Sequence, residues 1–100
     1  MGNYQIVWPS DFDRIEWLLE SKGVLFDIEV KVGDHTIMAT FYDPVRLSQD
    51  IEEEIQSSGF FSETFIIVLE RLTKRNIEAT LDKMYRSGLL ESMAKAQFDR

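Results

Sequence analysis

The segment between residues 26 and 41 constrains the fold more strongly than any other part of the chain. Apolar residues at positions 26, 28, 30 and 32 alternate with charged residues at 27, 29 and 31, which predicts a strand with one buried face. Gly33 and Asp34 then supply a two-residue hairpin turn. A slip of one residue would move the apolar set to the other face, so the register is strongly specified. The turn pairs four positions across the predicted hairpin: Val32 with His35, Val30 with Ile37, Ile28 with Ala39, and Phe26 with Phe41.

A strand and a helix are predicted before this hairpin. The strand covers Tyr4–Trp8 and ends at Pro9, which cannot donate a ladder hydrogen bond. Ser10 can cap a helix that extends to about Ser21, and Gly23 can end it. Helical spacing directs four apolar side chains of this helix to the core: Phe12, Ile15, Leu18 and Leu19.

A second helix is predicted directly after the hairpin. Asp43 suits its N-cap position and Pro44 suits its first helical position. The sequence Ser-Ser-Gly at residues 57–59 ends it. This helix has a narrow apolar stripe: Leu47, Ile51 and Ile55.

The last third of the chain predicts one strand followed by helices. Phe65–Leu69 is apolar on both faces, which favours a central strand covered on both sides, or at least a well-buried one. Thr73 can cap a third helix that stops at Gly88. Residues 89–100 predict either a short extra helix or a frayed tail. The third helix would turn three apolar side chains inward: Ile77, Leu81 and Met84.

These elements follow one another as β-α-β-β-α-β-α over a single α+β domain, residues 1–100. This order matches the split βαβ, ferredoxin-like arrangement with an added C-terminal helix. We therefore expect a four-stranded antiparallel sheet with its helices mainly on one face. A meander built from the same elements is the alternative.

Composition limits the chemistry and the location of the protein. The chain has no cysteine, which excludes a disulfide framework, a thiolate zinc site and a cysteine nucleophile. The first residues show no basic segment followed by an apolar one, so no signal peptide is expected. The longest apolar run, Phe65–Leu69, is far shorter than the ~20 residues of a membrane helix. We expect a soluble, cytoplasmic protein that does not contact a membrane.

No catalytic, cofactor or metal motif is visible in the sequence. His35 is the only histidine, and its place beside the hairpin turn indicates a solvated turn residue. The five glycines are scattered and form no phosphate-binding loop. We expect no enzyme activity, no cofactor and no metal. The alternative is an enzyme that uses carboxylates alone, which would require acids such as Asp27, Glu29 and Asp43 to converge in one cleft.

The charge of the chain is negative and unevenly distributed. Its formal net charge is −7. Residues 1–70 hold 14 acidic and 4 basic residues, whereas residues 71–100 hold 4 acidic and 7 basic residues. An acidic body repels phosphates, so direct binding of nucleic acid is disfavoured. The same field favours encounter with a basic protein, although acidity can also serve solubility alone.

The predicted second helix carries the densest group of acids, which makes it a candidate partner-binding face. Adjacent helical acids diverge, so a metal site is disfavoured. Solvation of a helix face is the usual explanation for such a run. Like charges at this density nevertheless cost helix stability, and a cationic partner would relieve that cost. The acids are Asp50, Glu52, Glu53 and Glu54.

Three aromatic residues are further candidates for partner binding. Trp17 lies opposite the apolar face of the first helix, and an exposed tryptophan often anchors an interface. It could instead pack beneath the tail or the first strand. Phe60 and Phe61 follow the second helix, and such a pair either plugs the end of a core or forms a binding patch.

The segment Phe41–Glu54, with the sequence FYDPVRLSQDIEEE, resembles a group of small bacterial proteins in which a hairpin leads into an acidic helix. The chain as a whole is similar in type to immunity proteins of bacterial toxin systems, such as contact-dependent growth inhibition. The resemblance implies a non-catalytic cytoplasmic protein that binds and blocks a cognate toxin, with a basic nuclease domain as the expected partner. The alternative function is a self-associating regulatory or adaptor domain, which would form a homodimer.

Overall fold

The hairpin is the centre of the fold in the computed structural model, which describes residues 4–98. Its strands are β2 (Val24–Val32) and β3 (His35–Tyr42), and they are antiparallel. Three of the four predicted cross-strand pairs are confirmed: Val32 with His35, Val30 with Ile37, and Ile28 with Ala39.

The fourth predicted pair is wrong, because β2 contains a bulge between Leu25 and Ile28. Two residues of β2 oppose one residue of β3 there, and Leu25 rather than Phe26 pairs with Phe41. Asp27 takes a left-handed backbone conformation with φ of 55°, which aspartate tolerates better than most residues. Because of the extra residue, the side chains of β2 before the bulge point to the opposite faces of the sheet from those that regular alternation predicts. Leu25 is consequently buried, whereas Phe26 is 50% exposed.

The sheet is mixed and has the strand order β1-β2-β3-β4. The edge strand β1 (Tyr4–Val7) is antiparallel to β2, but the other edge strand, β4 (Ile66–Val68), is parallel to β3. The prediction of a fully antiparallel sheet is therefore wrong. A parallel pair needs a crossover of about a dozen residues or more, and the long segment between β3 and β4, which contains a helix, provides one.

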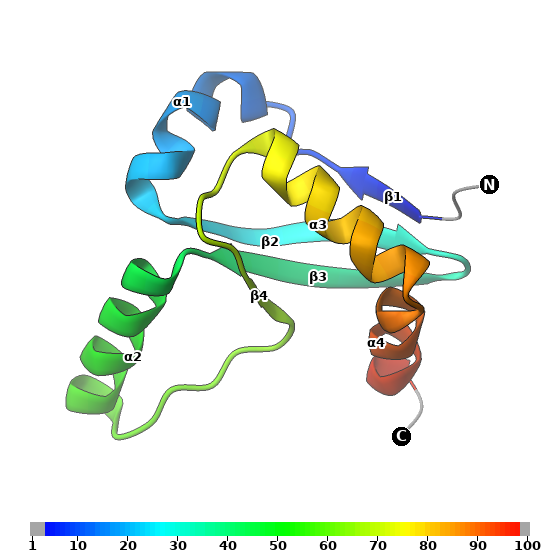
Figure 1. The fold of residues 1–100 in the computed structure, drawn as a ribbon. Helices are drawn as coiled ribbons and strands as arrows, with labels where there is room; N and C mark the ends of the chain where they lie inside the picture. The colour runs from blue at the N-terminus through cyan, green and yellow to red at the C-terminus, as the bar shows by residue number, and fades with distance from the viewer. Residues whose placement is uncertain (1–3, 99–100) are drawn as a thin grey trace.

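The ferredoxin-like arrangement is not confirmed, because β1 and β2 are direct neighbours. In a split βαβ unit the two strands joined by a helix are parallel and another strand separates them. Here α1 (Phe12–Lys22) joins two adjacent antiparallel strands. β1 pairs only with the second half of β2. α1 is about 16 Å long at 1.5 Å per residue. It lies along the first half of β2 and brings the chain to Val24, where β2 begins (Figure 1).

Strand β4 differs from the central strand predicted over Phe65–Leu69. It has only three residues and lies at the sheet edge. Ile67 and Leu69 are buried, but Val68 is exposed. The run is apolar throughout, so its sequence did not indicate that one face stays open.

Three helices enclose the core. Gly23 ends α1 in a left-handed conformation as predicted, but the N-cap of α1 is Asp11 rather than Ser10. Thr73 caps α3 (Lys74–Arg86) as predicted, because its side chain accepts a hydrogen bond from the Asn76 amide. The tail forms a helix, α4 (Leu89–Phe98), while residues 99–100 of the predicted tail, like residues 1–3, lie outside the described residues. These helices and the sheet bury a shared set of side chains that includes Phe12, Leu19, Ile28, Val30, Ile37, Phe41, Ile77, Leu81, Leu90 and Ala94.

The helix α2 (Pro44–Ser58) is packed differently from the other three. Asp43 caps it and Pro44 begins it, as predicted. It has no buried residue, and Figure 1 shows it projecting away from the sheet and the other helices. Its apolar stripe is only partly covered, and Ile55 is half-exposed. No helix within residues 4–98 has the length and apolar character needed to cross a bilayer.

Candidate functional site

A hydrogen-bond network ties the first half of α2 to the sheet. The Tyr42 hydroxyl of β3 donates to Oδ2 of Asp50 at 3.0 Å, and Nε of Arg46 donates to Oδ1 of the same carboxylate at 2.8 Å. Nη1 of Arg46 also donates to the Lys22 carbonyl oxygen at 3.1 Å. Asp50 therefore links α2 to β3 by accepting both hydrogen bonds. The part of α2 after Asp50 extends into solvent.

Tyr42 and Arg46 each keep one protonation state over the physiological pH range. Burial of the side chain raises the pKa of Tyr42 far above its usual value. The hydrogen bond to Asp50 and the charge of Glu63 raise this pKa further, in that order of importance. The hydrogen bond to Asp50 likewise raises the pKa of Arg46. Tyr42 thus stays a neutral donor and Arg46 stays a cation, so the base of α2 is held by charge-assisted bonds.

A hollow of about 330 Å³ lies where α2, the bulged strand and the loop after α2 meet. We call it the acidic pocket. Four carboxylates and three aromatic rings line it, and none of its lining residues is basic. The lining residues are Phe26, Tyr42, Asp50, Glu53, Glu54, Phe61, Ser62 and Glu63.

The structure brings together four of the seven residues predicted to bind a partner. Asp50, Glu53, Glu54 and Phe61 all line the acidic pocket. The other three lie outside its lining and are exposed on the surface: Glu52 on α2, Phe60 after α2, and Trp17 on α1.

Four lining residues were not predicted as site residues: Phe26, Tyr42, Ser62 and Glu63. Phe26 was assigned to the core, and only the bulge places its side chain beside α2. Tyr42 directly precedes the Asp43 cap, a position that gave no functional signal. Glu63 lies in the loop, and its closeness to Phe61 in the sequence was the one available sign that acids and aromatic rings meet here.

The acids do not form a metal site in the part of the chain that the structure describes. Within residues 4–98, no group of three or more histidine, cysteine or acidic side chains is placed to hold a metal ion. Of the acids considered for carboxylate catalysis, Asp43 caps α2 by accepting the Arg46 amide at 2.7 Å, and Asp27 lies in the bulge. The pocket carboxylates instead surround an open hollow that suits an organic cation.

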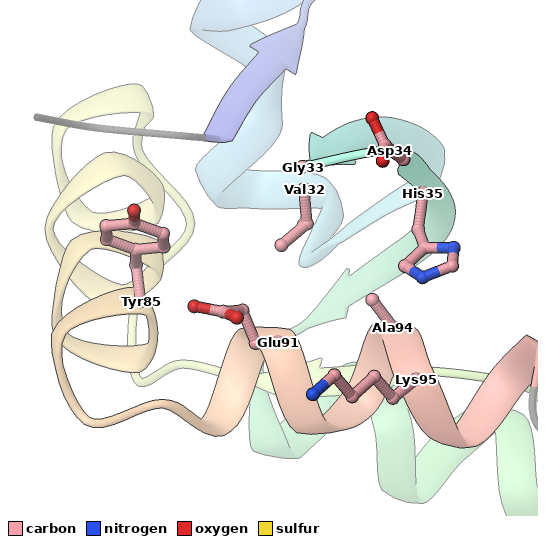
Figure 2. A pocket seen from close by; sticks show the side chains of 8 residues that line it. All are labelled: Val32, Gly33, Asp34, His35, Tyr85, Glu91, Ala94 and Lys95. Atoms are coloured by element: carbon pink, nitrogen blue, oxygen red, sulfur yellow. The ribbon is translucent and has the colours of Figure 1, made fainter.

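A second, smaller hollow of about 190 Å³ lies between the hairpin turn and α4. Figure 2 shows the His35 ring on its hairpin side and Glu91 and Lys95 on its α4 side. His35 lies at the turn where it was predicted, but its side chain is partly buried. This hollow mixes acidic and basic side chains, so its field is weaker than that of the acidic pocket.

Comparisons with protein-family models, curated proteins and solved structures find no match for this chain. The chemistry of the acidic pocket consequently rests on its own residues: carboxylates without a basic neighbour in the lining, set against aromatic rings.

Proposed function

We propose that this chain is a non-catalytic protein-binding module that acts in the cytoplasm as an immunity protein. In this proposal it neutralises a cognate bacterial toxin by binding a basic domain, such as a nuclease, through α2 and the acidic pocket. The observation that supports it most is the acidic pocket, where four carboxylates and three aromatic rings converge and no lining residue is basic.

The charge distribution supports a basic partner. Glu52, Glu53 and Glu54 are exposed on the projecting part of α2, and Glu63 is exposed in the loop that follows. A surface of one sign steers an oppositely charged partner and raises its association rate. A toxin that cleaves nucleic acid must present a basic surface to phosphates, and this acidic surface would occupy it.

Exposed aromatic side chains supply the apolar part of the proposed interface. Phe60 is 65% exposed beside α2, and Phe26 is 50% exposed in the pocket wall. Aromatic anchors often dominate binding energy where surrounding contacts exclude water. The acids would therefore raise the rate at which the partner associates, and the aromatic anchors would lower the rate at which the complex dissociates.

Co-expression with the product of a neighbouring toxin-like reading frame tests this function. We expect the two proteins to elute together and the toxin activity to be blocked. The Glu53→Lys variant should weaken binding at least about tenfold at low salt, because a reversed charge now faces the basic partner. Glu16→Lys, which makes the same change at an exposed position of α1, should have less than about a threefold effect. Absence of a complex, or equal effects of both variants, would count against the proposal.

One observation favours self-association as the second candidate function. A groove beside β4 and α3 includes Arg71, Lys83 and the exposed Val68, together with one acid, Glu70. Its two cations complement the acids of α2. A second copy could dock its α2 there, as in a regulatory or adaptor homodimer. Light scattering of the isolated protein distinguishes the two functions, since a stable homodimer supports only this one.

A further inference from the structure

The acidic pocket has the size of a site for one side chain. Its volume of about 330 Å³ lies at the lower end of the roughly 300–1,000 Å³ that ligand pockets span. It is open to solvent between α2 and the loop, so a chain end or a loop of a partner could insert a side chain without refolding this protein.

Its acids are available to a ligand. Asp50 already accepts from Tyr42 and Arg46. Within the described residues, Glu53, Glu54 and Glu63 have neither a salt bridge nor a side-chain hydrogen bond. Three carboxylates that form no direct ion pair with any residue that the structure describes therefore border one hollow.

The aromatic wall distinguishes between cations. The Phe26 and Tyr42 rings meet edge to face, with centroids 6.2 Å apart and an interplanar angle of 85°, and Phe61 also lines the hollow. A planar guanidinium can stack on an aromatic ring while it donates paired hydrogen bonds to a carboxylate. An ammonium group gains the charge attraction but lacks the flat surface and the paired donors.

We propose that the acidic pocket binds the guanidinium group of one arginine side chain from the partner protein. This inference rests on the proposed function, in which the partner is a basic protein domain. The side chain would lie against the rings of Phe26 and Phe61, with Glu53 and Glu63 as its main hydrogen-bond acceptors. Glu52, one residue from Glu53 on the same helix, lies outside the pocket lining and takes no part.

A titration with Nα-acetyl-L-arginine amide, followed by NMR, tests the assignment. We expect a Kd on the order of 1 mM, with the largest shifts on the ring protons of Phe26 and Phe61. Nα-acetyl-L-lysine amide should bind at least about fivefold more weakly. Equal affinity for the two amides, or shifts centred elsewhere, would overturn the proposal.

Matched variants separate the pocket from the general charge of α2. Glu53→Gln and Glu63→Gln should each raise the Kd for the arginine amide at least about fivefold, because each removes one charged acceptor. Glu52→Gln removes the same charge outside the pocket and should change it less than about twofold. Far-UV circular dichroism confirms that each variant is folded. An effect of Glu52→Gln equal to that of Glu53→Gln would contradict the assignment.

Partner binding provides an independent readout. If the toxin complex forms with wild-type affinity in Glu63→Gln, the arginine assignment fails while the proposed function stands. If the arginine amide binds in the pocket but no toxin complex forms, the proposed function fails and the partner assigned to the pocket fails with it.

Discussion

The hydroxyl of Tyr42 donates a 3.0 Å hydrogen bond to Asp50, which links the end of β3 to the middle of α2. Tyr42 is buried, and Asp50 lies two turns into a helix that has no buried residue. Arg46 binds the other oxygen of the same carboxylate at 2.8 Å. Because packing holds α2 so little, this bond contributes strongly to the position of the acidic pocket.

Replacing Tyr42 with phenylalanine should lower the free energy of unfolding by about 1–2 kcal/mol, since it removes a hydrogen bond to a charged acceptor. Urea denaturation measures the change. A double-mutant cycle with Asp50→Asn should show a coupling energy of at least about 0.5 kcal/mol. A coupling energy near zero would mean that the bond does not hold α2.

Tyr42 should resist ionisation. Burial, the hydrogen bond to Asp50 and the charge of Glu63 raise its pKa above about 10, the value for tyrosine in an unfolded chain. The resulting stability is present below pH ~10 and is lost as pH rises beyond it, because only the unfolded chain then releases the proton. Subtracting the 295 nm titration of Tyr42→Phe from that of the wild type should give no phenolate signal at pH 10. A normal titration there would refute the buried bond.

Gly23→Ala should destabilise the protein by about 2–4 kcal/mol. Gly23 has φ of +71°, and an added Cβ would lie 2.5 Å from Oδ2 of Asp43 and 2.9 Å from Cβ of Arg46. Gly59→Ala is the matched control, because Gly59 also ends a helix with positive φ but has open space around it. The control should cost only about 1 kcal/mol. Equal losses in thermal or urea unfolding would show that the contact with Asp43 does not matter.

Leu25→Ala and Phe26→Ala test the bulge in β2. Leu25 is buried, so its truncation should cost about 2–4 kcal/mol. Phe26 is half-exposed and mainly contributes its edge-to-face contact with Tyr42, so its truncation should cost about 1 kcal/mol. The opposite ranking would indicate the unbulged register, in which Phe26 faces the core.

The predictable parts of the fold are those that depend on neighbours in the sequence. The turn at Gly33 and Asp34 is set by a two-residue signal, and the caps Asp43 and Thr73 bond to amides three residues away. The bulge was not predictable, because Phe26 and Ile28 flank Asp27 with the spacing of an uninterrupted strand, and the consecutive apolar residues Val24, Leu25 and Phe26 do not indicate which face is buried. The parallel placement of β4 also lacked a local signal, since a long crossover permits either direction.

The candidate site divides in the same way. The acids of α2 and the pair Phe60 and Phe61 stand out in the sequence, so their candidacy could be stated from it. Which of them share a hollow depended on contacts with Phe26 and Tyr42, which come from other elements. Glu52 and Glu53 are equivalent as sequence neighbours, yet only Glu53 lines the pocket.

The sequence by itself determined the hairpin register up to Ile28, the start of α2, and the concentration of negative charge in the first seventy residues. Those features follow from periodicity, caps and composition, which act over a few residues or over the whole chain. Only the tertiary structure decided that Phe26 leaves the core, that β4 takes the edge beside β3, and that four carboxylates meet three rings. These outcomes depend on long-range packing, in which one extra residue in a strand reverses the face that all residues beyond it present.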